Sequence, residues 1–511
     1  MPEFILFIIE DLAIVLSVLM MIFLVNQTLK YHQGSSYRLK DGLRYFKSFY
    51  TKHYYYLLLI PFIFILDKWY MQLIYLIYLI TLYLFTRPKA QISKLVYTSR
   101  IWRLCGFIII FYTALGTILM MNIAFKQLLS LMALYISIMP ILTYFASLLM
   151  YPIEKLINKF YHIAARRKLK KFQPLVIGIT GSSGKTSVKN YIYELLRNSM
   201  ITYMSPKSYN TLNGLSMTIN EYLGVKDAVL VLEMGATKLG DIEELVNFVP
   251  VDIAVITQIT SQHLQTFISI ENIINEKMKL VKSLNDKGIA ILNYDCKEIR
   301  NYQVKSKGKI ITIGTTADCD YYAKDIEMDL DGIRFICVYD NKEMVIKSKL
   351  VGRYNVNNIL AAIAVARVLH VHDKVIEDGV SLFSSVPHRL EVKKDNVITV
   401  IDDSYNSNPL GFKMALEVLN LAQNKKTIIT PGIVEAGQAS EAINYDLAID
   451  IAKVCDEVIL IDNQASKYIH QGLINNNFEN IHVVNSFKSA YALVSEGTVL
   501  IENDLPDNYF I

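Results

Sequence analysis

The sequence feature that most restricts the fold is a loop of small residues between an apolar run and a helical pattern. Residues 175–180 are apolar and rich in β-branched side chains, and residues 188–196 place apolar side chains at helical spacing. Glycines let backbone N–H groups turn toward an anion, and a helix N-terminus adds partial positive charge. The motif predicts an α/β domain with a phosphate-binding loop, formed by Thr180, Gly181, Ser182, Ser183, Gly184, Lys185, Thr186 and Ser187.

Side chains in and after this loop fit the chemistry of ATP with Mg²⁺. Lys185 can reach the outer phosphates, and the Thr186 hydroxyl can ligate Mg²⁺. Glu233 ends a second apolar strand pattern, where a carboxylate can hold Mg²⁺ directly or through water, or can make a structural hydrogen bond. Asn293 ends a third strand pattern, and its amide fits either a ribose or base edge or an Asx turn.

The first 150 residues are far more apolar than the rest. A run of 22 residues, Phe4–Val25, is long enough to span a bilayer core of about 30 Å, and it lacks the basic start and cleavage site of a signal peptide. Further runs cover 54–85, 105–125 and 128–151, and the first of these is long enough for two short spans hinged at Asp67. We therefore predict an α-helical membrane domain of about five helices over residues 1–151.

Basic residues occupy every second connection between these runs. Segments 26–53, 87–103 and 152–173 hold six, five and seven Lys and Arg residues. The positive-inside rule then places the N-terminus outside and everything after Tyr151 in the cytosol. Residues 152–173 are interpreted as a basic juxtamembrane linker, so the expected location is the plasma membrane, with several spans and the lipid bilayer as a partner.

The distribution of charge and the spacing of the cysteines argue against other classes of protein. Residues 1–173 carry a net charge of +14 and the remainder −9, and no basic and aromatic interleaving outside the membrane region suggests nucleic-acid binding. The five cysteines lack metal-binding spacing, which favours a reducing compartment. Strand and helix patterns alternate again after residue 386, so we expect a central domain over 174–385 and a smaller α/β domain over 386–511.

With these motifs in order, residues from about 174 to 511 resemble the Mur ligase family, and most closely its members that add D-alanyl-D-alanine. The resemblance implies a central P-loop ATPase domain and a smaller Rossmann-like C-terminal domain. It rests on the phosphate loop, Asn210-Thr211 with Asn213, Glu233-Met-Gly235, His263 with Lys277, Gly352–Asn358, Pro387–Glu391 and Asp402–Pro409.

The resemblance also implies a role for each matching residue. Glu233 would hold a first metal ion, while His263 and Lys277 would support a second, with the lysine carbamylated as in several family members. Asn355 and Asn358 would contact adenine. Arg389 and Asp403 would reach the nucleotide from the C-terminal domain. The implied catalytic set is Lys185, His263, Lys277, Arg389 and Asp403, with metal contacts from Thr186, Glu233, His263 and Lys277.

Two departures from the family pattern shape the expected function. Membrane spans stand where typical members carry a domain that binds a UDP-linked sugar, and residues 497–506 lack the Lys-Gly-Ser of dipeptide-adding members. We expect a membrane-anchored amide ligase that joins an envelope precursor or lipid-linked acceptor to an amino acid or dipeptide donor. The alternatives are a ligase that extends a secreted peptide polymer and a non-catalytic ATP-binding membrane scaffold.

Overall fold

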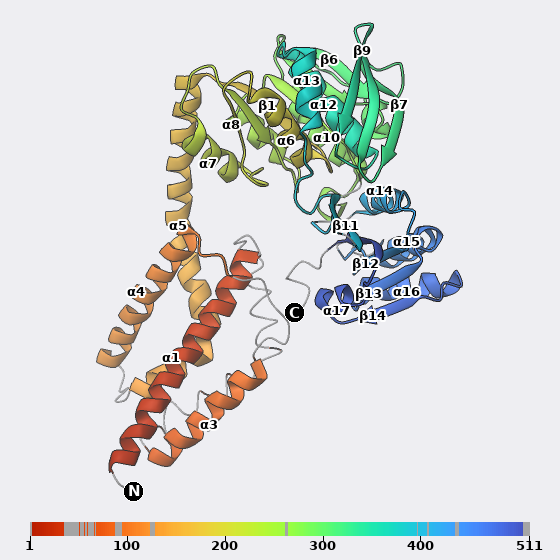
Figure 1. Ribbon diagram of the computed structural model, residues 1–511. Helices are drawn as coiled ribbons and strands as arrows, with labels where there is room; N and C mark the ends of the chain where they lie inside the picture. Colours follow the sequence, from red (N-terminus) through yellow and green to blue (C-terminus); the bar gives the residue numbers. More distant parts are fainter. Residues whose placement is uncertain are drawn as a thin grey trace. The chain divides into compact units, whose positions relative to one another are not determined.

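The computed structural model describes residues 3–34, 51, 56, 59, 66, 68–86, 95–122, 128–260, 264–395, 397–405, 408–434 and 439–503. The chain divides into two compact units, Met1–Lys159 and Phe160–Leu505. Each unit has hydrophobic clusters of its own, and the elements of both are drawn in Figure 1.

The described part of the first unit is helical. Its helices are α1 (Glu3–Gly34), α3 (Trp69–Thr86), α4 (Ser99–Asn122) and the first part of α5 (Leu128–Phe172). Three of them, α1, α4 and α5, are long and apolar enough to cross a membrane, and α3 is a shorter apolar helix. The predicted spans 4–25, 105–125 and 128–151 fall on α1, α4 and α5, whereas most of the short span expected over 54–66 lies outside the described residues.

Polar contacts connect these helices inside the first unit. The hydroxyls of Ser17 on α1 and Tyr75 on α3 lie 2.9 Å apart. Arg103 of α4 donates two hydrogen bonds, of 2.8 and 2.9 Å, to the carboxylate of Glu154 on α5. A buried polar group needs such a partner to offset its lost hydration. Residues 152–172, which we interpreted as a linker, are helical and continue α5 without a break.

The second unit begins with a nine-stranded sheet in the order β2-β3-β1-β4-β5-β6-β7-β8-β9. Strands β1 to β7 pair in parallel, and β7, β8 and β9 form an antiparallel meander. The alternating stretches 332–338 and 343–350 are typical of antiparallel strands, and they pair in this way. The same pairing was predicted for 309–313, and there the prediction is wrong, because this strand is parallel to both of its neighbours. The strands are β1 (Leu175–Thr180), β2 (Thr202–Met204), β3 (Val229–Glu233), β4 (Ile253–Ile256), β5 (Ile289–Asn293), β6 (Lys309–Gly314), β7 (Tyr321–Asp329), β8 (Gly332–Tyr339) and β9 (Lys342–Ser348).

Helices cover both faces of this sheet (Figure 1). Side chains of a strand alternate between faces, so Ile177 and Ile179 of β1 enter one core cluster and Val176 enters the other. The first cluster includes residues of α6, α12 and α13, and the second includes residues of α7, α8 and α10. The helices are α6 (Lys185–Leu196), α7 (Leu212–Tyr222), α8 (Asp241–Phe248), α9 (Leu264–Phe267), α10 (Ile270–Lys282), α11 (Lys297–Arg300), α12 (Tyr354–Val368) and α13 (Asp373–Ser381).

A six-stranded sheet follows in the order β10-β11-β15-β12-β13-β14, parallel except for β10. The apolar runs 398–402, 427–430, 457–461 and 498–501, which carry the strand pattern noted after residue 386, all form strands. The elements are β10 (Glu391–Lys394), β11 (Ile398–Asp403), α14 (Pro409–Leu419), β12 (Lys426–Thr430), α15 (Ser440–Val454), β13 (Glu457–Ile461), α16 (Gln464–Asn475), β14 (Ile481–Val484), α17 (Phe487–Tyr491) and β15 (Gly497–Glu502).

Candidate functional site

The phosphate loop lies between β1 and α6, and two of its glycines have no room for a side chain. Gly184 caps α6 with φ of +80°, and a Cβ there would lie 2.7 Å from Oδ1 of Asn358. A Cβ on Gly181 would collide with the hydroxyl of Thr257. Positive φ is costly for residues with a side chain, so glycine is needed at position 184 for conformation as well as space.

Two lysines converge on the carbonyl oxygen of Gly181. Lys185 of α6 donates to it at 2.8 Å and also to the carbonyl of Ser182 at 3.1 Å. Lys277 of α10 donates to the Gly181 carbonyl at 2.9 Å.

The environment of these lysines disfavours their positive charge. Burial lowers the pKa of Lys185. Burial, and next the nearby charge of Lys185, lower the pKa of Lys277 to about 7. A polyanion in the loop would offset this cost, because an opposite charge favours the protonated amine. The donor set of the loop therefore fits the phosphate groups of a nucleotide.

Glu233 lies beside this loop because β3 pairs with β1 in parallel, with Ile179 opposite Glu233. Its Oε2 accepts a hydrogen bond from Thr186 at 2.9 Å, and its Oε1 accepts one from Asn210 at 3.0 Å. The ammonium of Lys189, which the sequence analysis did not single out, lies 3.7 Å from Oε2. Lys189 and Glu233 are both buried, so each charge depends on the other.

A magnesium ion fits this arrangement better than a metal held by protein alone. Within the described ranges, no three His, Cys, Asp or Glu side chains come together as a metal site. Mg²⁺ is commonly held by one or two protein oxygens together with substrate phosphates, and the hydroxyl of Thr186 and the carboxylate of Glu233 supply such oxygens. The predicted ligand His263 lies outside the described residues.

A cavity of about 450 Å³ opens in front of the loop and receives side chains from segments far apart in the sequence. Its lining combines the phosphate loop and the ends of β3 and β5 with residues after β9 and around β11. The predicted site residues that line it are Ser182, Ser183, Gly184, Lys185, Thr186, Ser187, Glu233, Asn293, Asn358, Arg389 and Asp403.

Four predicted residues within the described ranges are not among the residues that line this cavity. Thr180 ends β1, Gly181 follows it in the loop, and Lys277 of α10 donates to the Gly181 carbonyl. Asn355 is buried, and its amide donates to the carbonyl of Val351 at 2.7 Å. The Asn355 oxygen accepts hydrogen bonds from Asn358 and Tyr191, so the polar atoms of Asn355 are engaged within the protein.

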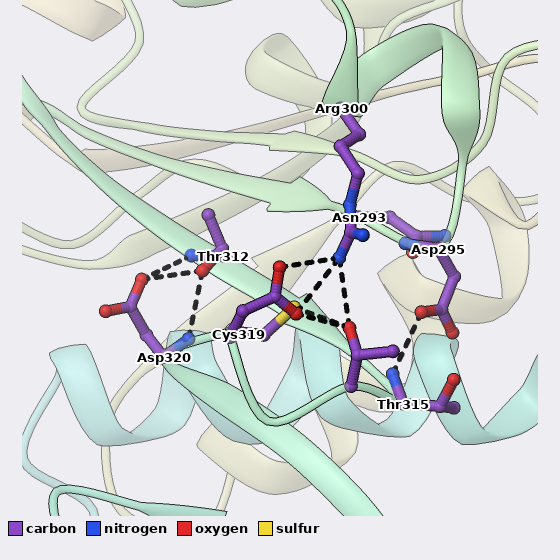
Figure 2. A network of polar contacts seen from close by, with 9 residues as sticks. Asn293, Asp295, Arg300, Thr312, Thr315, Cys319 and Asp320 are labelled. Atoms are coloured by element: carbon purple, nitrogen blue, oxygen red, sulfur yellow. Dashed lines mark hydrogen bonds and ion pairs between the residues drawn. The ribbon is translucent and has the colours of Figure 1, made fainter.

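Asp295 and Asn357 also line the cavity, and the family resemblance assigned neither of them a nucleotide contact. Oδ2 of Asp295 accepts a hydrogen bond from the amide of Asn357 at 2.9 Å, which joins the end of β5 to α12. Asn293 accepts from the backbone N–H of Asp295 at 3.1 Å, so the Asx turn considered as an alternative is present while Asn293 still lines the cavity. Figure 2 shows Asn293 and Asp295, with the second Asp295 oxygen bonded to the N–H of Thr315.

Arg389 and Asp403 reach the cavity from the segment around β11. The guanidinium of Arg389 lies 4.3 Å from the ring centre of Tyr405, and Oδ1 of Asp403 accepts from the N–H of Leu390 at 3.1 Å. His388 and Leu390, on either side of Arg389, have φ of +63° and +45°. Non-glycine residues rarely adopt such values, and strained backbone of this kind concentrates at functional sites.

This fold and cavity define a P-loop nucleotide-binding protein in which a second α/β sheet contributes to the same cleft. The profile of the Mur ligase middle domain matches residues 179–366, and that of the Mur ligase glutamate ligase domain matches residues 388–501. The chain belongs to the Mur ligase family, as the sequence motifs predicted. Members of this family are ATP-dependent acid–amino acid ligases and use ATP with Mg²⁺, in agreement with the predicted enzyme class and cofactors.

Similar proteins of known name include several ligases that add D-alanyl-D-alanine. The UDP-N-acetylmuramoyl-tripeptide–D-alanyl-D-alanine ligase of Bacillus subtilis is 27% identical over 314 residues, which cover 61% of this chain and 67% of that protein. The ligase of the same name from Escherichia coli is 28% identical over 57% of this chain and 65% of its own length. The chain thus spans about two thirds of the length of these relatives.

Solved structures of this family share the fold. A MurF ligase from Thermotoga maritima in complex with ADP is 26% identical, with a TM-score of 0.62, over 69% of this chain and 81% of that chain. A MurF from Acinetobacter baumannii gives a TM-score of 0.61 over 69% of this chain and 78% of that one, at 22% identity, which shows the fold alone. Both family profiles lie after residue 178, so the helices α1, α3 and α4 fall outside them.

Proposed function

We propose that this protein is a membrane-anchored, ATP-dependent ligase that joins a carboxylate to an amine in cell-envelope synthesis. The observation that carries the proposal is the single cavity that receives Lys185, Thr186 and Glu233 together with Arg389 and Asp403. Residues from the two sheets can surround one nucleotide there, and exclusion of water from such a cleft would protect a reactive acyl phosphate from hydrolysis.

The reaction consists of two displacements that need no protein nucleophile. An oxygen of the acceptor carboxylate attacks the γ-phosphorus of ATP, ADP leaves, and an acyl phosphate forms. The amine donor then attacks the acyl carbon, phosphate leaves, and an amide results. Bound Mg²⁺ would neutralise charge on the phosphates. Lys185 and the N–H groups of the loop would hold the transferring phosphoryl group, and Thr186 and Glu233 would fix the position of the metal.

The N-terminal helices support the membrane part of the proposal. α1, α4 and α5 have the length and apolar composition of membrane spans, and basic residues gather in every second connection. α5 continues through residues 152–172 into the segment that precedes β1, so one helix would link the bilayer to the catalytic part. An acceptor delivered by a lipid or by the membrane suits an enzyme held at the bilayer. The proposed domain boundaries are 1–151 for the membrane domain, 152–173 for the juxtamembrane segment, 174–385 for the central domain and 386–511 for the C-terminal domain.

The test uses the full chain purified in detergent with ATP, Mg²⁺, envelope lipid extract and a panel of amino acids and dipeptides. We expect ADP release that requires both an acceptor and an amine. Lys185→Ala should lower turnover by about 100-fold or more, since it removes a charge that acts on the transition state. Lys342→Ala, which changes an exposed lysine on β9, is the control.

Two results would count against the proposal. ATP binding without any acceptor-dependent turnover would favour the scaffold alternative. Normal turnover in the Lys185→Ala variant would refute the assignment of the phosphate loop. If a soluble acceptor supports ADP release as well as the lipid fraction does, the assignment as an ATP-dependent ligase is retained. The proposal of a lipid-linked acceptor is then refuted.

A further inference from the structure

Lys189 of α6 is a buried cation to which the proposed reaction gives no part. Its side chain is 1% exposed, and its ammonium lies 3.7 Å from Oε2 of Glu233, whose side chain is 2% exposed. The ammonium also donates a hydrogen bond to the backbone carbonyl of Lys207. Lys189 therefore joins the helix that follows the phosphate loop to the end of β3 and to the segment after β2.

The segment after β2, residues 205–210, is attached to Glu233 at both of its ends. The buried hydroxyl of Ser205 accepts a hydrogen bond from the backbone N–H of Glu233 at 3.3 Å. The side-chain amide of Asn210 donates to Oε1 of Glu233 at 3.0 Å. Ser208 and Asn210 also line the cavity in front of the phosphate loop. The segment is therefore both a wall of the cavity and a support for the carboxylate.

The middle of this segment has an unusual backbone conformation. Lys207 has φ of +46°, a value that residues with a side chain rarely adopt. Such a conformation persists only where the surrounding structure holds it in place. The hydrogen bond from the buried ammonium of Lys189 to the carbonyl of Lys207 is a contact of this kind. Lys189 thus helps to set the course of the cavity wall.

The same ammonium helps to orient the carboxylate of Glu233. Oε2 accepts a hydrogen bond from Thr186 at 2.9 Å and faces the ammonium of Lys189, while Oε1 accepts from Asn210. Both oxygens are therefore fixed by groups from two separate segments of the chain. Groups that hold a metal ligand in this way strengthen metal binding, although they do not contact the metal themselves.

The burial of this ion pair is not explained by stability. The loss of hydration of two buried charges can exceed their mutual attraction, and replacement of such a pair by neutral side chains is often harmless to stability. Removal of one partner alone is costly, because the other charge is left buried without a counter-ion. A charged pair next to a phosphate loop therefore points to a use in binding.

We propose that Lys189 is a positioning residue that fixes the Glu233 carboxylate and the segment 205–210 for the binding of Mg²⁺ together with ATP. The inference rests on the proposed binding of MgATP in this cavity. Lys189 is not among the residues that line the cavity, so it acts through Glu233 and the segment. Loss of its ammonium should therefore weaken the response of ATP binding to Mg²⁺.

The experiment measures the dissociation constant of ATP for the detergent-purified full chain by calorimetry, in EDTA and over a series of Mg²⁺ concentrations. The readout is the Mg²⁺ concentration that gives half of the gain in ATP affinity. Lys189→Met keeps a long apolar side chain and removes the charge, so this concentration should rise about tenfold.

Lys425→Met is a matched control. It removes an ammonium that lies 2.9 Å from Oε2 of Glu457, whose side chain is 9% exposed, in the other sheet. Lys425 and Glu457 are not among the residues that line the cavity. The control should leave the Mg²⁺ dependence of ATP binding unchanged.

A double variant separates positioning from stability. Lys189→Met combined with Glu233→Gln leaves no unpaired charge, so its Tm should lie close to that of the original protein, whereas Lys189→Met alone should have a lower Tm. Because Lys189 acts through Glu233, the Mg²⁺ dependence of the double variant should equal that of Glu233→Gln alone. This comparison also serves if Lys189→Met alone does not fold.

Two results would overturn the inference. One is an unchanged Mg²⁺ dependence of ATP binding in Lys189→Met. The other is a further loss of Mg²⁺ response when Lys189→Met is added to Glu233→Gln, which would mean that the lysine acts independently of the carboxylate. No ATP binding by the original protein at any Mg²⁺ concentration would instead refute the proposed function itself.

Discussion

The hydroxyl of Thr186 donates a 2.9 Å hydrogen bond to Oε2 of Glu233, across 47 positions of the chain. The bond joins the first turn of α6 to the end of β3, and Lys189 adds a buried positive charge 3.7 Å away. A carboxylate held in this way is preorganised to accept a cation next to the phosphate loop.

Replacement of Glu233 by Gln should weaken the response to Mg²⁺. The amide keeps the size of the side chain but loses its charge, so the Mg²⁺ concentration that gives half-maximal turnover should rise by about 10- to 100-fold. A Mg²⁺ titration of ADP release measures this. Glu243→Gln removes an exposed carboxylate on α8 and should leave the titration unchanged. An unaltered titration in the Glu233 variant would remove Glu233 from the proposed metal site.

Replacement of Gly184 by Ala should abolish nucleotide binding. The residue has φ of +80°, and the added Cβ would lie 2.7 Å from Oδ1 of Asn358, so the loop has to move. Gly240→Ala is a matched control, since Gly240 caps α8 with φ of +94° but has open space around the added Cβ. Both changes should cost about 1 kcal/mol of stability, seen as a small fall in Tm, and only the first should prevent ATP binding.

Replacement of Lys277 by Met should remove a pH dependence of stability. The pKa of Lys277 is lowered to about 7 in the folded protein, against about 10.4 in an unfolded chain. Between these values the unfolded chain binds one more proton, so the free energy of unfolding rises with pH.

The cost of burying the Lys277 ammonium is thus fully present at pH 6 and declines above pH 7. The Met variant should be more stable than the original protein at pH 6, by about 2 kcal/mol, with the difference shrinking toward pH 9. Thermal unfolding across this range measures the effect. Lys282→Met, on the exposed side of the same helix, should show no such trend. If the free energies of unfolding of the Met variant and the original protein differ by the same amount at every pH, the prediction is contradicted.

The proposed membrane topology can be tested with fusions along α5. An alkaline phosphatase domain, which is active only after export, should be active when fused after Ser130 and inactive when fused after Lys171. Residue 130 lies near the start of α5 and residue 171 near its end, so the two fusions report the two ends of one helix. Activity at Lys171 together with inactivity at Ser130 would reverse the proposed orientation.

Much of the fold could be predicted from the pattern of apolar and polar residues within short stretches of the sequence. The strands of the parallel sheets are short apolar runs that end in polar residues, and the phosphate loop is a contiguous motif, so β1, β3, β4 and β5 were predictable from neighbouring residues alone. The helices α8, α10 and α16 and the strand β2 were not predicted. Strand β2 has only three residues, too few to show a period.

The sequence by itself determined the class of the domains, the phosphate loop and the apolar helices, because each depends on the order of nearby side chains. Only the tertiary structure decided that Lys277 meets Gly181 from 96 positions away, that Lys189 pairs with Glu233, and that Asn355 turns inward. The hydrogen bond from Lys189 to the carbonyl of Lys207 was likewise invisible in the sequence. Such contacts depend on how strands pair and on the direction in which each side chain leaves its helix. Both are determined only when segments distant in the sequence pack together.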